Sequence, residues 1–201
     1  MRSTRSKKKF RAVQSDSRVD LVIYFLLAFL LFSAVFLCLF YYSRCRARAI
    51  EEAFPPLGQI IKVDGLDVHF VDIPARSAHA PVVVFLHGAS GNLRDPYYAF
   101  AGRLDTIMRQ IFVDRPGHGW SERHAYMVTA FEQARHIERF LRQIGVEKAI
   151  FVGHSWGGAL ALTMAVHFSA RGEALLLNAP VSHPWPGGIN WYYPLAASPL
   201  F

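Results

Sequence analysis

Hydrophobic and polar positions divide the chain into two parts with different periods. Residues 21–42 form a run of 22 residues without a charged side chain. At 1.5 Å per helical residue this run is about 33 Å long, enough to cross a bilayer core of about 30 Å. From residue 57 onward, short apolar runs alternate with amphipathic stretches, which is typical of strands joined by helices. The pattern predicts a transmembrane signal-anchor helix over 20–43, a linker over 44–56 and an α/β domain over 57–201.

Within the α/β domain, the apolar runs predict a mostly parallel sheet. The segments 59–63 and 67–73 flank Asp64-Gly65, which favours a two-residue hairpin and an antiparallel opening. Residues 128–143 carry apolar side chains at helical spacing and end at Gly145, so we expect a crossover helix there. Three further runs predict buried parallel strands; they are 81–86, 110–113 and 149–152. The run 174–178 predicts the last strand, at an exposed edge of the sheet.

The run that begins at Ala149 breaks into the sequence Gly153-His-Ser-Trp-Gly157 and then into a helix of small residues. Gly-x-Ser-x-Gly between a strand and a helix is the sequence form of a nucleophile elbow. Gly153 and Gly157 leave room for a strained turn at Ser155. We expect the backbone N–H of Trp156, at the helix N-terminus, to face the charge that develops when the serine attacks a carbonyl. The motif predicts that Ser155 is a catalytic nucleophile.

Two further motifs follow the first two parallel strands. The first strand ends in His87-Gly-Ala-Ser-Gly-Asn92, and the second ends in Asp114-Arg-Pro-Gly-His-Gly-Trp-Ser121. With these motifs and the elbow in this order, the chain resembles the α/β-hydrolase superfamily over about residues 57 to 185. The resemblance implies the α/β-hydrolase fold, with a mostly parallel sheet that carries helices on both faces.

The resemblance also implies roles for individual residues. The backbone N–H groups of Ala89 and Trp156 would form the oxyanion hole, and residues 114–121 would be a structural loop that borders the site. The supporting positions of the two site loops would be His87, Gly88, Gly153 and Gly157.

The residue type at the elbow narrows the chemistry that the resemblance implies. Family members that open epoxides or displace halide carry aspartate at this position, whereas this chain carries Ser155. We therefore expect a serine hydrolase that acts on an ester, a lactone, an amide or a carbon–carbon bond beside a carbonyl, without a cofactor. The expected partner is a small-molecule or lipid-like acyl substrate, whose identity the sequence leaves open.

Most histidines are expected to be structural. His87 resembles the oxyanion-loop histidine of the family. For His154 we expect a side chain that points into the fold and is hydrogen-bonded there. For His118 a role in its turn is favoured over catalysis. The other histidines show no metal-ligand spacing, and no metal site is predicted; they are His69, His79, His124, His136, His167 and His183.

The acid and the histidine of a triad would follow Ser155 in the family's chain order. The only later acid, Glu173, begins a strand that ends in Asn178, and neither His167 nor His183 takes the family's base position. The aromatic and proline-rich stretch from about residue 181 resembles the opening of a lid. We interpret the chain as the N-terminal part of a hydrolase, inactive by itself. The alternative is a non-catalytic α/β-hydrolase-like membrane protein or binding module without a complete triad.

Charge separates the two parts of the chain. Residues 1–49 hold 10 basic and 2 acidic residues, while residues 50–201 hold 12 and 13, and the whole chain carries +7. Seven lysines and arginines precede the apolar run and three follow it, so the positive-inside rule makes 1–19 a basic cytoplasmic tail. The hydrolase domain would then be exoplasmic, or periplasmic in a Gram-negative cell. The alternative is a signal peptide cleaved after Ala49. Nothing in the sequence suggests a nucleic-acid partner, and it leaves the oligomeric state open.

Overall fold

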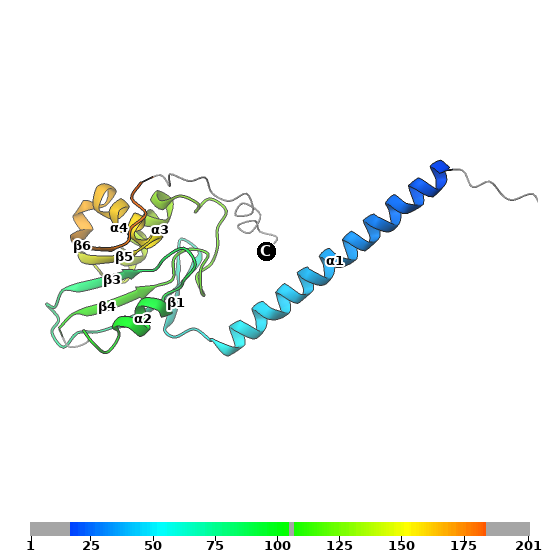
Figure 1. Cartoon of the computed structure of the whole chain (residues 1–201). Helices are drawn as coiled ribbons and strands as arrows, with labels where there is room; N and C mark the ends of the chain where they lie inside the picture. The colour runs from blue at the N-terminus through cyan, green and yellow to red at the C-terminus, as the bar shows by residue number, and fades with distance from the viewer. Residues whose placement is uncertain (1–16, 105–106, 184–201) are drawn as a thin grey trace, which may run out of the picture. The chain divides into compact units, whose positions relative to one another are not determined.

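The chain divides into two units, which are described separately. The computed structural model describes residues 17–104 and 107–183 (Figure 1). The first described unit is helix α1, and the second begins at Pro55. The basic tail over residues 1–16 and most of the expected lid, from residue 184 onward, lie outside the described residues.

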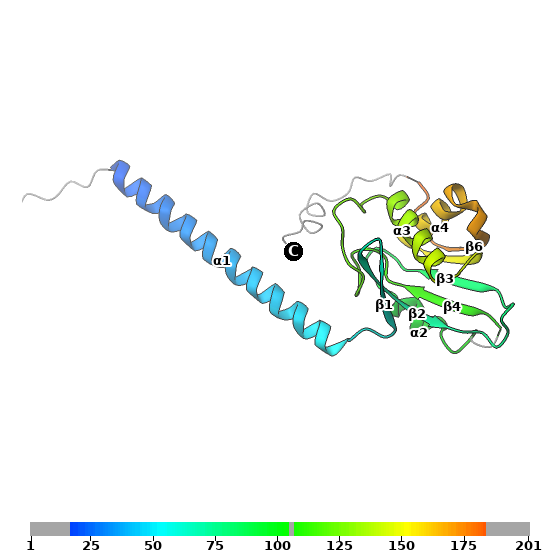
Figure 2. The same ribbon diagram turned by 180° about the vertical axis from the view of Figure 1, so that it is seen from behind.

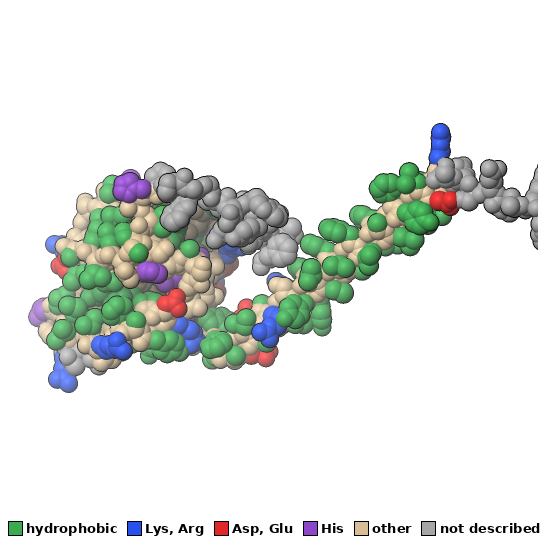
Figure 3. All heavy atoms as spheres, viewed as in Figure 1, with side chains coloured by type: hydrophobic (Ala, Val, Ile, Leu, Met, Phe, Trp, Pro, Cys, Tyr) green, Lys and Arg blue, Asp and Glu red, His purple; other side chains and the backbone are tan. Residues whose placement is uncertain are grey.

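Helix α1 (Ser17–Ala53) is a single helix of 37 residues, which corresponds to about 55 Å. Exposed hydrophobic side chains line the helix between its charged ends (Figure 3), and by length and composition it qualifies as a membrane span. The helix does not stop where the apolar run stops. Residues 44–53, expected to be a linker, are helical, and this expectation is corrected. Arginine, alanine and glutamate are strong helix formers, and the helix ends just before Pro55-Pro56.

The second unit is built on a six-stranded sheet with the strand order β1-β2-β4-β3-β5-β6. The pairs β1–β2 and β2–β4 are antiparallel, whereas β4, β3, β5 and β6 run parallel to one another. The predicted mostly parallel sheet with an antiparallel opening is confirmed. The strand bounds are β1 (Gln59–Val63), β2 (Leu66–Ile73), β3 (Val82–Leu86), β4 (Arg109–Val113), β5 (Ala149–His154) and β6 (Gly172–Asn178).

The first hairpin is closed by the two residues that the sequence indicated. Asp64 has φ 51° and Gly65 has φ 84°, and Val63 pairs with Leu66 across the turn. Two successive positive φ angles are the mark of a type I′ turn, whose twist suits a two-residue hairpin. The register that follows carries Phe70 of β2 opposite Val113 of β4.

Helices cover the sheet on both faces (Figures 1 and 2). On one face, α3 (Ala130–Gln143) and α4 (Trp156–His167) pack against each other and against the buried side chains of the larger core cluster. The other face carries α2 (Arg94–Phe100), which the sequence did not predict because seven residues are too few to show a period. The 3-10 turn Ser169–Arg171 leads into β6.

The predicted crossover helix is α3. Thr129 caps it, since its hydroxyl accepts from the backbone N–H of Glu132 while the Glu132 side chain accepts from the backbone N–H of Thr129. In α3, the apolar side chains Ala134, Ile137, Phe140 and Leu141 are fully buried. Phe131 is 43% exposed and lies against the rings of His167 and Phe168.

Close packing of α4 on the sheet depends on Gly157. A Cβ atom at this position would lie 2.0 Å from the backbone oxygen of Leu86 in β3. We predict that Gly157→Ala lowers the free energy of unfolding by about 3 kcal/mol or more, because backbone must move to relieve the overlap. Gly172→Ala is the control, since its Cβ would meet no atom closer than 3.9 Å. Urea unfolding of the detergent-solubilised full-length protein measures both, and equal losses would contradict the prediction.

Candidate active site

Ser155 occupies the sharp turn between β5 and α4. Its backbone has φ 52° and ψ −116°, a conformation that is strained for a residue with a side chain. Hydrogen bonds hold the turn from both sides: the N–H of Ser155 donates to Asn178 O at 3.0 Å, and its carbonyl accepts from the N–H groups of Gly158 and Val181, each at 3.0 Å. The surrounding backbone therefore fixes the strained conformation that presents the serine.

The glycines on either side of Ser155 permit the close approach of strand and helix. A Cβ atom at Gly153 would lie 2.5 Å from Gly157 O, and one at Gly158 would lie 2.6 Å from the Cβ of Pro180. Such distances exclude any side chain. Glycine is thus required at Gly153 by the backbone of α4 and at Gly158 by Pro180.

The loop after β3 lies directly against the elbow. At Gly88, a Cβ atom would be 3.4 Å from Ser155 Cβ and 3.1 Å from His154 Nδ1. Within residues 17–104 and 107–183, the backbone N–H groups of Ala89 and Trp156 donate no hydrogen bond. Two segments that meet at Ser155 therefore each carry an N–H donor with no acceptor among the described residues, as an oxyanion site requires.

His87 is buried and bonded through both ring nitrogens. Nε2 accepts from the backbone N–H of Arg115 at 3.0 Å, so the ring proton is on Nδ1, which donates to Gly88 O at 2.9 Å. Burial, and next the charge of Arg115, lower the pKa of His87 to about 3. The ring is therefore neutral at neutral pH and stiffens the loop.

Arg115 was missed by the sequence interpretation and is 1% exposed. Its Nε donates to His87 O at 3.0 Å and its Nη2 to Gly88 O at 2.9 Å, while Nη1 donates to Gln133 Oε1 of α3 at 2.9 Å. Burial lowers the pKa of Arg115 to about 10, and the nearby Asp114 opposes this shift. The guanidinium is therefore still charged at neutral pH. Its partners lie 18 to 28 residues away, so no local sequence pattern reveals the contact.

His118 contacts the same loop. Its Nε2 lies 2.9 Å from Ala89 O and 3.2 Å from Arg115 Nη2. Its Nδ1 also lies 3.2 Å from Pro116 O. In the tautomer with the proton on Nε2, the ring donates to Ala89 O, which is the shortest of the three contacts. Burial, followed by the charge of Arg115, lowers the pKa of His118. The half-buried ring thus donates to the carbonyl of Ala89, next to the His87 and Gly88 carbonyls that Arg115 holds.

The expectation for His154 is wrong. Its ring is exposed, and it makes no hydrogen bond with any residue that the structure describes. Side chains alternate along a strand, so His154 shares a face of β5 with the half-buried Val152. This is the α2 face of the sheet, and α2 is too short to cover β5 and β6.

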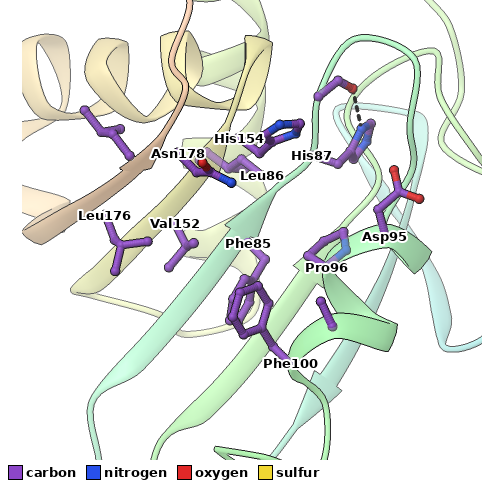
Figure 4. Close-up of a pocket in the computed structure, with 14 residues that line it drawn as sticks. Phe85, Leu86, His87, Asp95, Pro96, Phe100, Val152, His154, Leu176 and Asn178 are labelled. Carbon is purple, nitrogen blue, oxygen red and sulfur yellow. Dashed lines mark hydrogen bonds between the residues drawn. The ribbon is translucent and has the colours of Figure 1, made fainter.

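A hollow of about 480 Å³ lies on this face (Figure 4). Its rim includes His87, His154 and Asn178, and its wall is formed by apolar side chains such as Phe85 and Leu176. Ser155 does not line it. Leu176 is 56% exposed on the edge strand, so the hollow is the uncovered face of the sheet rather than a cavity built around the serine.

None of the candidate acid and histidines downstream of the elbow is hydrogen-bonded to Ser155. Glu173 lies at the opposite end of β6 from Asn178, and His167 is the last residue of α4 rather than a mid-helix residue. His183 contacts the hydroxyl of Ser182 at 2.9 Å. Across the described part of the chain, no side chain is hydrogen-bonded to the Ser155 hydroxyl, and no three His, Cys, Asp or Glu side chains cluster around a metal position.

Comparison with known proteins decides the family. Residues 81–200 match the model of the alpha/beta hydrolase fold family, and the sheet order and elbow are already consistent with it. The chain belongs to the α/β-hydrolase family.

Individual relatives cover the same region. An acetyltransferase component of the acetoin cleaving system of Cupriavidus necator is 32% identical over 131 residues, which are 65% of this chain and 34% of that protein. The proline iminopeptidase of Xanthomonas citri is 33% identical over 126 residues, 61% of this chain and 39% of the enzyme. A point mutant of the meta-cleavage product hydrolase CumD superposes with a TM-score of 0.57 at 26% identity, over 64% and 47% of the two chains. The α/β-hydrolase chain thus spans less than half the length of these relatives.

The low pKa of His87 predicts loss of stability in acid. The unfolded chain binds a proton near the ordinary pKa of 6.5, whereas the folded chain binds it only near 3. The stabilisation is therefore complete above about pH 6.5 and is lost as the pH falls toward 3, by a few kcal/mol in all. We expect His87→Asn to reduce the difference between the unfolding free energies at pH 7 and pH 4, while His79→Asn, at an exposed position, leaves it unchanged. An unaltered difference in His87→Asn would contradict the prediction.

Proposed function

We propose that the protein is a membrane-anchored serine hydrolase that forms an acyl-enzyme at Ser155. The observation that carries the proposal is the strained backbone of Ser155, with φ 52°, beside two N–H donors that have no acceptor among the described residues. Strain of this kind persists only where the surroundings enforce it, and it concentrates at functional sites. Membership of the α/β-hydrolase family supports the same conclusion.

In the proposed reaction, Ser155 Oγ attacks the carbonyl carbon of the substrate and its proton passes to a base. The carbonyl oxygen becomes an oxyanion, which the N–H groups of Ala89 and Trp156 stabilise. Collapse of this intermediate expels the leaving group and leaves the acyl group on Oγ, and water then releases it. We propose that the histidine and the acid of the triad come from the portion of the family fold that this chain does not span.

The proposed substrate is a small molecule with a reactive carbonyl. Serine at the elbow favours acyl transfer over the opening of an epoxide. The relatives include an iminopeptidase and a meta-cleavage product hydrolase, whose names point to different substrates. The proposal therefore extends to the reaction type and not to one substrate.

A second candidate function is binding without catalysis. The observation that favours it is the absence, among residues 17–104 and 107–183, of a base hydrogen-bonded to the Ser155 hydroxyl. In that case the elbow and its loop would hold a carbonyl ligand without reacting with it.

The proposed anchor is α1. An exposed apolar helix of this length loses most of its contact with water when it inserts into a bilayer. The bias of seven basic residues before the span against three after it favours a hydrolase domain on the exoplasmic side.

We predict that a fluorophosphonate probe labels Ser155 in the full-length protein. Ser155→Ala should abolish labelling and reduce ester hydrolysis by several orders of magnitude, because the nucleophile is lost. Ser169→Ala, which removes an exposed serine just past the C-terminus of α4, is the matched control and should behave as the wild type. Mass spectrometry of the labelled peptide identifies the site. Hydrolysis that persists undiminished in Ser155→Ala would reject the serine mechanism, and an unlabelled wild type would favour the binding module.

The topology makes a separate prediction. A reporter that is active only outside the cytoplasm, fused after Phe201, should be active, and a cytoplasmic reporter at the same position should be silent. The fusion should also stay with membranes through alkaline carbonate extraction. Activity of the cytoplasmic reporter would reverse the orientation. Release of a soluble species that begins near Ile50 would instead identify the apolar run as a signal peptide.

A further inference from the structure

We propose that Arg115 is a positioning residue of the oxyanion site: it aims and polarises the Gly88–Ala89 peptide, so that the Ala89 N–H becomes a directed and stronger donor. The inference rests on the proposed function, because it assigns the Ala89 N–H to the oxyanion. It goes beyond that function by naming a buried cation, remote from the substrate, on which the strength of the donor depends.

The direction of the peptides is the first step. Three consecutive carbonyl oxygens of the loop are held on one side by side chains from the 114–121 loop. Arg115 Nε holds that of His87 at 3.0 Å, and Arg115 Nη2 that of Gly88 at 2.9 Å. His118 Nε2 holds the carbonyl of Ala89 at 2.9 Å. In a trans peptide the N–H points opposite to the C=O, so the N–H of Ala89 is turned away from the guanidinium.

The Ala89 N–H makes no hydrogen bond with the described residues. Gly88 lies against the elbow, with 3.4 Å between its Cβ position and Ser155 Cβ. Fixing the carbonyl of Gly88 therefore leaves the opposite end of the same peptide free to bind an anion at the elbow.

Polarisation is the second step. The Gly88 carbonyl accepts from Arg115 Nη2 and from His87 Nδ1, both at 2.9 Å, and more weakly from Gly91 N at 3.4 Å. Hydrogen bonds to a carbonyl oxygen draw electron density from the amide nitrogen, and a charged donor does so most. The N–H of the same peptide becomes a better donor to a developing oxyanion.

The guanidinium also contacts α3. Arg115 is 1% exposed, and Gln133 of α3 accepts from its Nη1 while donating through Nε2 to Met127 O at 3.1 Å. The planar fork of arginine serves three acceptors at once, which the point charge of a lysine cannot do. A lysine at position 115 would therefore lose some of the hydrogen bonds that the arginine donates to the loop and to α3.

Three variants of the full-length protein test the inference. Arg115→Met removes the donors at similar length, and Arg115→Lys keeps the charge but not the fork. Gln133→Met is the matched control, because it breaks the contact of Arg115 with α3 and leaves both loop carbonyls bonded to the arginine. Thermal melting reports the structural cost of each change.

The first readout follows the peptide without any reaction. Within residues 1–201, glycine precedes alanine only at Gly88–Ala89 and Gly158–Ala159. Labelling glycine carbonyls with ¹³C and alanine nitrogens with ¹⁵N therefore selects two peptides of this chain in a triple-resonance spectrum. We expect the Ala89 amide proton to resonate downfield of that of Ala159 in the wild type. It should move upfield in Arg115→Met, less so in Arg115→Lys and little in Gln133→Met, with Ala159 unmoved in all three.

The second readout is the rate at which a fluorophosphonate phosphonylates Ser155. Loss of an oxyanion donor costs about 10²- to 10³-fold, so loss of its positioning residue should cost about 10- to 100-fold. For a turned-over ester the loss should fall on kcat rather than KM. Gln133→Met should react at close to the wild-type rate.

The outcomes separate this inference from the proposed function. A folded Arg115→Met with an unmoved Ala89 amide and an undiminished rate would overturn the inference. An equal loss of rate in Gln133→Met would also overturn it, because the loss would then come from less rigid packing and not from the hydrogen bonds of Arg115 with the loop carbonyls. If the wild type is not labelled at Ser155, the serine mechanism fails, and the oxyanion role of Arg115 fails with it. If Arg115→Met does not fold, the upfield shift and slower labelling of Arg115→Lys decide the question.

Discussion

The buried carboxylate of Asp114 is the interaction on which the arrangement of this fold's site depends. Its Oδ1 accepts from the backbone N–H of Leu93 at 2.7 Å, and its Oδ2 accepts from Trp120 N at 3.0 Å and from His69 Nδ1 at 2.6 Å. A carboxylate at 1% exposure is tolerated only when its oxygens are bonded in this way. One side chain thus joins β2, the end of β4, the start of α2 at Leu93 and the 114–121 loop. Gly119 is required because a Cβ there would lie 2.0 Å from Oδ2.

The next residue in the chain extends this arrangement to the elbow. Arg115 lies in the loop that Asp114 anchors. Its guanidinium donates hydrogen bonds to the carbonyl oxygens of His87 and Gly88. A buried anion and a buried cation are therefore adjacent in sequence, and each is satisfied mainly by backbone groups rather than by the other. Because backbone groups are the partners, the pair fixes loop conformation. Ser155 is fixed by different means, through backbone hydrogen bonds and glycine contacts that leave its strained conformation no room to relax.

Local patterns were sufficient for most of the sheet. The apolar runs and the Asp64-Gly65 turn each act over a few residues, so their structures follow from nearby sequence. The patterns failed where a local signal was weak or was overridden. Helix α2 is too short to show a period, and the charged segment 44–53 continues α1 because no residue before Pro55 stops a helix. The prediction that the His154 side chain is buried was wrong. Burial on its face of β5 depends on whether a neighbouring element covers that face, and the sequence of the strand does not specify this.

The sequence by itself determined the main strands of the sheet, the elbow with Ser155 at its turn, the glycines that the turn requires, and an apolar helix long enough to span a membrane. These depend on backbone conformation and on periodicity, which short segments encode. Only the tertiary structure decided which loops meet at the serine, that Arg115 is buried among their carbonyls, and that His87 is held neutral. Contacts between residues 18 to 28 positions apart, and the desolvation that shifts a pKa, arise only when the strands are assembled side by side, so no segment of the chain carries them alone.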